Sequence, residues 1–181
     1  MKFEPASIPD VVQVFPQVFG DARGFLMETW HARKLAEAGI GAQFVQENLS
    51  RSAAGVLRGM HYQIQRAQGK LVRALRGRVY DVAVDIRRSS ATFGQWVGVW
   101  LSEEERNAVW IPAGFAHGFY VAEDAEVLYA CTDFHAPEHE RSIRWDDPEI
   151  GIDWPLGGKR GPSLSKKDAT GLSLAQAELY P

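Results

Sequence analysis

The sequence predicts an all-β fold, an antiparallel sandwich or barrel with a few short helices. Three strand-like runs support this prediction: V-Y-D-V-A-V-D-I at 79–86, W-V-G-V-W-L at 96–101 and A-E-V-L-Y-A-C-T at 125–132. The turn-forming residues that separate such runs are Gly77, Ser89-Ser90, Gly94, Pro112-Ala113-Gly114, Glu123-Asp124 and Pro137. Many short strands with regularly spaced turns are typical of antiparallel sandwiches and barrels.

The first of these runs has two distinct faces. Val82, Val84 and Ile86 share one face, and Asp81 and Asp85 lie on the other, because successive side chains of a strand point to opposite sides. The second run is apolar throughout and suits a buried strand.

Helical signals are few. The segment 30–39 carries Leu35 and two alanines and stops at Gly39, a residue that commonly ends helices. Residues 102–105 have capping-box spacing but leave room for only a turn or two, and 172–180 is expected to form a short closing helix. Strands do not alternate with long helices, so a doubly wound fold is not expected.

Composition indicates one ordinary globular domain, residues 1–181. The chain has 181 residues, 45% of them apolar and 24% charged, and its net charge is −3. A nucleic-acid partner is not expected, because no basic stripe is present, and no apolar run approaches the ~20 residues that span a membrane. The single cysteine, Cys131, and an N-terminus without an apolar signal core predict a cytoplasmic protein. Without a G-x-G-x-x-G or P-loop motif, a tightly held dinucleotide is not expected either.

The densest polar cluster is R-G-M-H-Y-Q at 58–63. An imidazole on the inner face of a small barrel is placed to act as a base near neutral pH, although His61 alone fits a hydrogen-bonded core histidine better. Arg58 and His61 have opposite strand parity, so both can face one pocket only if Gly59 permits a bulge or bend.

A second cluster, W-I-P-A-G-F-A-H-G-F at 110–119, contains a P-x-G-x-x-H turn. This turn is a plain strand connection or the second signature of the cupin barrels, whose metal-binding members carry H-x-H in the first signature. Here that position has His61 followed by Gln63, and Lys70 would repel a cation nearby. A closed divalent site needs about four ligands, so we expect no catalytic metal.

Three further groups are ambiguous when taken singly. Tyr129 on the strand 125–132 fits a core tyrosine, and L-S-K-K-D at 164–168 fits a surface loop whose Asp168 could orient a distant histidine. The segment 19–28 fits a hairpin, or an Arg23–Glu28 pair that grips a ligand.

Taken together, these segments resemble the dTDP-4-dehydrorhamnose 3,5-epimerase family over nearly the whole chain. The resemblance rests on F-G-D-A-R-G-F (19–25), F-V-Q-E-N (44–48), V-L-R-G-M-H-Y-Q (56–63), A-Q-G-K-L-V-R (67–73), V-Y-D-V-A-V-D-I-R (79–87), F-G-Q-W-V-G-V (93–99), W-I-P-A-G-F-A-H-G-F (110–119), E-H-E-R-S-I-R-W-D-D-P (138–148) and L-S-K-K-D (164–168). It implies a cupin-type double-stranded β-helix (jelly roll), a homodimer, no metal and no redox cofactor.

The resemblance also implies roles for individual residues. The catalytic base would be His61, oriented by Asp168, with Tyr129 as the acid on the opposite face and Lys70 stabilising the enolate oxygen. The residues that fall on positions resembling those that hold the nucleotide sugar are Arg23, Glu28, Gln46, Glu47, Asn48, Arg58, His117, His135, Glu140 and Lys167. The region of Arg23 and Glu28 would come from the partner subunit.

The implied activity is inversion of C3 and C5 of dTDP-4-dehydro-6-deoxy-D-glucose to give dTDP-4-dehydro-L-rhamnose for dTDP-L-rhamnose and polysaccharide biosynthesis. The chain departs from the family pattern at Ala130, where a lysine is common, and at His135, where a tyrosine stacks on thymine. These departures leave two alternatives, a C3-only epimerase of a related sugar and a nucleotide-sugar-binding cupin without turnover. A metal-dependent cupin oxygenase is a more distant one.

Overall fold

The computed structural model describes residues 1–158 and 161–181 and confirms the all-β prediction. Its strands are β1 (Lys2–Pro5), β2 (Val12–Phe15), β3 (Val18–Asp21), β4 (Gly24–Met27), β5 (Gln46–Ser52), β6 (Leu57–Gln63), β7 (Lys70–Asp85), β8 (Trp96–Ser102), β9 (Ala108–Ile111), β10 (Phe115–Cys131) and β11 (Glu140–Ser142). The helical segments are α1 (Ala32–Glu37) and two 3₁₀ turns, η1 (Pro137–His139) and η2 (Asp168–Thr170).

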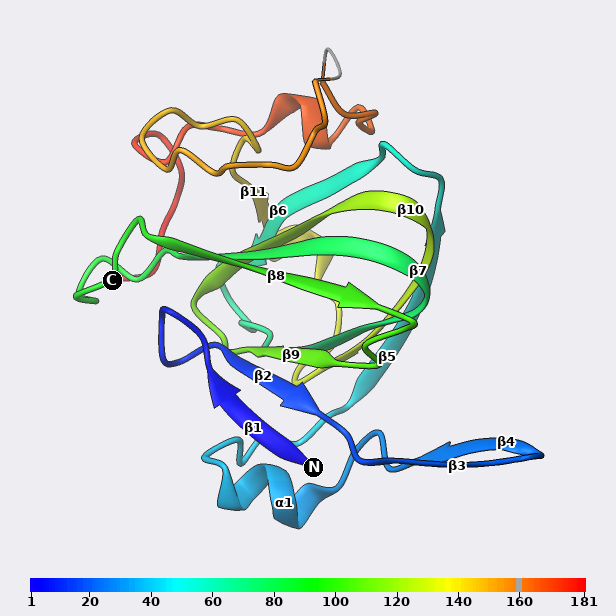
Figure 1. Ribbon diagram of the computed structural model, residues 1–181. Coiled ribbons are helices and arrows are strands. Elements are labelled where there is room, and N and C mark those ends of the chain that lie inside the picture. The colour runs from blue at the N-terminus through cyan, green and yellow to red at the C-terminus, as the bar shows by residue number, and fades with distance from the viewer. Residues whose placement is uncertain (159–160) are drawn as a thin grey trace.

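The strands curl into a barrel around the two longest ones, β7 and β10, as Figure 1 shows. These two strands pair antiparallel from Asp85 opposite Phe115 to Lys70 opposite Cys131. The first half of β10 also pairs with β6 and its second half with β5, while β7 pairs first with β9 and then with β8. Within one nine-stranded sheet, each long strand therefore changes neighbours along its length, which lets the sheet curl and close as in a jelly roll.

The bend at which β7 and β10 change neighbours lies at Gly77. Its φ of +69° is unfavourable for other residues, and a Cβ there would lie 2.1 Å from the carbonyl oxygen of Asp124. The β10 register shifts opposite this point, between Val121 and Val127. The prediction that Gly77 and the pair Glu123-Asp124 separate strands is wrong, because they mark a bulged bend inside continuous strands.

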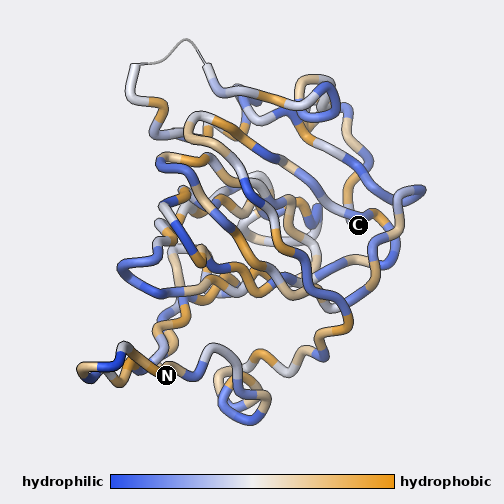
Figure 2. The backbone as a smooth tube through the Cα atoms, turned by 90° about the vertical axis from the view of Figure 1, so that its right-hand side faces the viewer, coloured by the Kyte–Doolittle hydropathy of each residue, from blue (hydrophilic) through white to orange (hydrophobic). Residues whose placement is uncertain are grey.

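Three apolar clusters hold the barrel together. One fills its interior and includes Val72, Val79 and Phe119. A second lies between the outer face of β6 and β7 and the C-terminal segment, and it includes Val82 and Trp154. In the third, α1 covers β2 and β9. Figure 2 shows polar and apolar positions alternating along the strands, as expected of strands with two different faces.

The helix expected at 30–39 is confirmed as the shorter α1, and Gly39 follows it with φ +83°. The closing helix expected at 172–180 is wrong, because this stretch forms turns and two isolated bridges instead. Its backbone groups bond to neighbouring segments: Arg144 N donates to Leu172 O (2.9 Å) and Arg88 N donates to Tyr180 O (3.0 Å). A helix would have to give up these tertiary hydrogen bonds.

The hairpin of β3 and β4 projects away from the barrel (Figure 1). Its large apolar side chains are exposed: Phe19 by 58%, Phe25 by 56% and Leu26 by 74%. Within the described parts of the chain, no helix has the length and hydropathy that crossing a membrane requires.

Candidate active site

An irregularity in β6 turns Arg58 and His61 toward the same pocket. In the pairing of β6 with β10, His61 lies opposite His117 and Arg58 opposite Phe119, so three residue steps on β6 match two on β10. Gly59 makes this possible with φ +141°, and a Cβ at Gly59 would lie 2.5 Å from the Cα of Gly118. The bulge that the strand parity required is therefore present.

The pocket has a volume of about 280 Å³ and collects residues from β5, β6, β7 and β10, from the start of β11 and from the segment 165–168, which leads into η2. Its lining residues are Ser50, Arg58, His61, Lys70, His117, Phe119, Tyr129, Glu140, Ser165, Lys167 and Asp168. Larger hollows exist elsewhere on the described surface, but this one unites the four residues for which a catalytic role was predicted.

His61 and Asp168 form a close imidazole–carboxylate pair. The distance from His61 Nε2 to Asp168 Oδ1 is 2.6 Å, and Asp168 is only 4% exposed. Burial raises the pKa of Asp168, but hydrogen bonds from His61 and Ser165 lower it more, to about 2. The carboxylate is therefore ionised at neutral pH and accepts a hydrogen bond from Nε2–H, which leaves the lone pair of neutral His61 on Nδ1.

Tyr129 lies in the second half of β10, and Lys70 is the first residue of β7. Both line the same pocket as His61. Burial raises the pKa of Tyr129, so its phenol keeps the proton that an acid must supply. Burial lowers the pKa of Lys70, since an ammonium is costly to desolvate.

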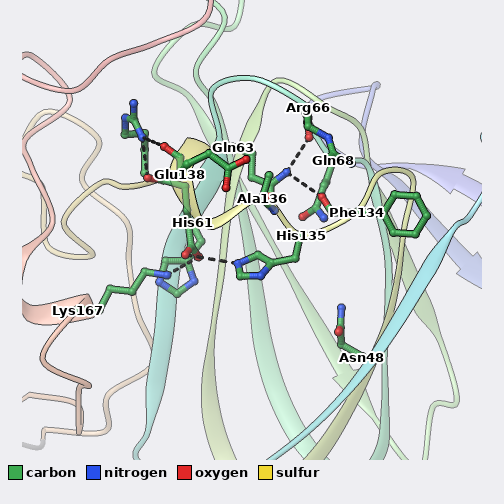
Figure 3. A network of polar contacts seen from close by, with 12 residues as sticks. Asn48, His61, Gln63, Arg66, Gln68, Phe134, His135, Ala136, Glu138 and Lys167 are labelled. Carbon is green, nitrogen blue, oxygen red and sulfur yellow. Dashed lines mark hydrogen bonds and ion pairs between the residues drawn. The ribbon is translucent and has the colours of Figure 1, made fainter.

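The rim of the pocket carries a cluster of charged groups around Glu140. Its carboxylate pairs with the ammonium of Lys167 and lies 3.6 Å from His135 Nε2. Figure 3 shows His135 and Lys167 approaching this carboxylate from two sides, close to His61. Burial raises the pKa of Glu140, but the hydrogen bond and charge of Lys167 outweigh it, and the net shift is downward.

A second buried imidazole–carboxylate pair joins His117 to Asp81, with 2.9 Å between Nε2 and Oδ2. Asp81 was not predicted as a site residue. The sequence did contain a signal for Asp81, because this residue lies on the strand face opposite Val82. If that face points into the barrel, a charged residue on it needs a buried partner. Ser165, Ser50 and Phe119 also line the pocket and were not predicted.

The residues predicted on β5 lie on two different faces. Gln46 and Asn48 lie on the inner face and bond each other (3.0 Å), and Gln46 Oε1 accepts the backbone N–H of His135 (2.8 Å). Glu47 lies on the outer face and lines a separate cavity with Ala130 and the buried Arg73. The structure therefore does not bring Glu47 to this pocket.

Arg23 and Glu28 lie outside the pocket as well. Arg23 is in the β3–β4 turn, where its guanidinium pairs with Asp21 at 2.6 Å. Glu28 follows β4 and pairs with Lys34 at 2.7 Å. Both side chains are occupied by local ion pairs within the chain.

Across the two described ranges, 1–158 and 161–181, no three His, Cys, Asp or Glu side chains gather as metal ligands would.

An imidazole–carboxylate pair, a protonated phenol and a lysine in one pocket of a jelly roll define a cupin-type acid–base enzyme. The sequence model of the dTDP-4-dehydrorhamnose 3,5-epimerase family matches residues 5–176. The chain belongs to this family, and it is an enzyme with the family's 3,5-epimerase activity.

Individual relatives agree with this assignment. The chain is 59% identical to a dTDP-4-dehydrorhamnose 3,5-epimerase of Pseudomonas aeruginosa, over 100% of both chains. A crystal structure of the epimerase from Legionella pneumophila, in complex with dTDP-4-keto-L-rhamnose, superposes with a TM-score of 0.95 at 49% identity and covers 99% of this chain and 97% of that one. A 3'-monoepimerase from Streptomyces bikiniensis, in complex with dTDP-quinovose, is more distant at 34% identity and a TM-score of 0.88, covering 96% and 88% of the two chains.

Proposed function

We propose that the 3,5-epimerisation runs through this single pocket, with His61 as the base and Tyr129 as the acid. The sugar's 4-keto group makes the hydrogens on C3 and C5 acidic. His61 Nδ1 takes the proton, the electron pair of the broken C–H bond moves into an enolate, and the Tyr129 hydroxyl delivers a proton from the opposite face. The carbon is thereby inverted, and the reaction is redox-neutral, so the proposal includes no metal and no redox cofactor.

The enolate needs more than proton transfer. General acid–base catalysis supplies about 10²–10⁴-fold, and a cation or donor at the developing oxyanion supplies about 3–4 kcal/mol in a water-poor pocket. Lys70 is proposed for this role because it lines the pocket. Burial is the main cause of its lowered pKa, and no hydrogen bond to another described residue contributes to that shift. Asp168 stabilises the imidazolium that forms on His61.

The dTDP part of the substrate is proposed to lie across the rim. Four of the proposed binding residues line the pocket: Arg58, His117, Glu140 and Lys167. Beside the pocket lie His135, Gln46 and Asn48, whereas Glu47 faces away from the pocket of its own subunit. The two phosphates of a nucleoside diphosphate suit guanidinium and ammonium groups. The imidazole of His135 is exposed enough to stack on a base. The structure from Legionella pneumophila, with its dTDP-sugar, supports this class of ligand.

We propose that the working form is a homodimer in which the partner supplies Arg23 and Glu28. The β3–β4 hairpin supports this, because it leaves the barrel with Phe19, Phe25 and Leu26 exposed to solvent. Such a patch commonly marks an interface, and a symmetric dimer buries it twice. The single domain 1–181 and the cytoplasmic location stay predictions.

Deuterium exchange tests the reaction. When the protein is incubated with dTDP-4-keto-6-deoxyglucose in D₂O, deuterium is expected at both C3 and C5. Incorporation at C3 alone would identify a monoepimerase, and tight binding without incorporation would identify a binding protein without turnover. The His61→Ala variant is expected to bind dTDP but to exchange neither position.

The Tyr129→Phe variant separates the two faces. His61 can still remove a proton and return a deuteron to the same face, so recovered substrate is expected to gain deuterium while inverted product falls sharply. An equal loss of both would contradict the division of labour between the two residues.

Mixing two inactive variants tests the shared site. Subunits carrying His61→Ala and subunits carrying Arg23→Ala are each expected to be nearly inactive. After exchange, each heterodimer has one intact site, so about a quarter of wild-type activity should return. Activity that stays at the level of the separate variants would show that Arg23 does not act across an interface.

A further inference from the structure

We propose that Ser165 is a positioning residue, which acts through Asp168 to hold His61 in the one tautomer that can take a proton from the sugar. This proposal rests on the proposed role of His61 as the base. It concerns a serine for which the sequence predicted no role.

The hydroxyl of Ser165 holds Asp168 from two directions. Ser165 Oγ donates to Asp168 Oδ2 over 2.7 Å and accepts the backbone N–H of Asp168 over 3.1 Å. The other carboxylate oxygen, Oδ1, faces His61 Nε2 at 2.6 Å and the backbone N–H of Gly59 at 3.5 Å. Each oxygen of Asp168 thus has its own donor, and the plane of the carboxylate is fixed toward the imidazole.

This arrangement decides which ring nitrogen is basic. An ionised carboxylate can only accept, so Asp168 selects the tautomer of His61 with hydrogen on Nε2 and the lone pair on Nδ1. Without the Ser165 hydroxyl, Oδ2 loses its side-chain donor in a site where Asp168 is only 4% exposed and water replaces the bond poorly. The carboxylate can then rotate away from Nε2, and the Nδ1–H tautomer becomes populated.

The segment that carries Ser165 is tied to the strand that carries His61. Leu57 N on β6 donates to Ser163 O over 3.0 Å, and Ser163 forms a bridge with Val56. Ser165 is therefore anchored to the same backbone as the base, although the two residues are far apart in the sequence. This anchoring makes the hydroxyl a geometric constraint on the imidazole.

The variants Ser165→Thr and Ser165→Val test the proposal, because their side chains have nearly the same shape and differ in the hydroxyl. Ser165→Thr is expected to keep the wild-type kcat, whereas Ser165→Val is expected to lower kcat about tenfold, with KM within about twofold of wild type. In ¹⁵N spectra of the histidine-labelled, ligand-free protein, neutral His61 should carry hydrogen on Nε2 in the wild type and in Ser165→Thr. Ser165→Val should show a mixture of tautomers.

Ser90→Ala is the matched control. Ser90 Oγ donates to the buried Asp85 over 2.6 Å, outside the pocket, so its loss should lower the melting temperature and leave both kcat and the His61 tautomer unchanged. The proposal is overturned if Ser165→Val keeps the Nε2–H tautomer, or if it raises KM with kcat unchanged, which would make Ser165 a substrate contact. The His61 tautomer is measured without substrate, so this test does not depend on the proposed reaction. If the proposed reaction is wrong, the wild-type protein itself will show no deuterium exchange into the sugar.

Discussion

Replacing Asp168 by asparagine removes the charge that orients His61 while keeping the size of the side chain. The hydrogen bond to Nε2 is 2.6 Å long and lies in a buried site, where a bond to a charged group is worth about 1.5–3 kcal/mol. At about 1.4 kcal/mol per factor of ten, losing it lowers kcat about 10- to 150-fold.

The tautomer adds to this loss. One oxygen of Asp168 accepts from Ser165 Oγ and the other from His61 Nε2 and Gly59 N, but an asparagine has one oxygen only. If the asparagine oxygen keeps the hydrogen bond from Ser165 Oγ, the asparagine NH₂ group points at His61 Nε2. Nε2 must then accept this hydrogen bond, so the imidazole hydrogen moves to Nδ1, the nitrogen that must be basic. A wrong tautomer costs about 10⁴-fold in a comparable serine-protease triad. We therefore expect kcat of Asp168→Asn to fall by about 10² to 10⁴.

The assay is the rate of deuterium incorporation at C3 and C5 under saturating substrate, with the folded fraction measured by circular dichroism. Asp147→Asn is the control, because Asp147 is equally buried and accepts backbone N–H groups of Glu149 (2.8 Å) and Leu174 (2.8 Å) away from the pocket. Both variants should lose stability, and only Asp168→Asn should lose turnover per folded molecule. A kcat for Asp168→Asn within about threefold of wild type would refute the reasoning.

Three further predictions follow from the same geometry. Gly59→Ala places a Cβ 2.5 Å from the Gly118 backbone at φ +141°, so urea unfolding should show a loss of at least about 2 kcal/mol; a midpoint equal to wild type would contradict the steric argument. Lys70→Gln should lower kcat about 10²–10³-fold while dTDP binding measured by calorimetry stays unchanged, and a preserved kcat would remove Lys70 from the mechanism. The folded-state pKa of Asp168, about 2, lies below its ordinary value of 3.8, so its contribution to stability is present above pH ~4 and is lost as the pH falls toward 2. Wild type and Asp168→Asn should thus converge in unfolding free energy between these pH values, and a constant gap would contradict the shift.

Local patterns in the sequence predicted the strands well because a strand repeats every two residues. Val82 and Asp81 lie on opposite faces as their alternation indicated, and Gly59 has the irregularity that the parity of Arg58 and His61 required. Gly77 shows the limit of such patterns. A glycine with positive φ can either end a strand or bend a continuous one. At Gly77, only the register of the opposite strand β10 shows that the strand bends and continues.

The sequence by itself determined the alternating strands, the turn glycines and the motifs that carry the family resemblance, because these depend on neighbours within a few residues. Only the tertiary structure decided that Asp168 meets His61, 107 positions away, that Glu47 turns from the pocket while Gln46 does not, and that Leu172 bridges to a neighbouring segment instead of starting a helix. Such contacts depend on how the bent sheet closes into the barrel. Closure is set by the sum of packing and hydrogen bonding over the whole chain, which no local window of residues contains.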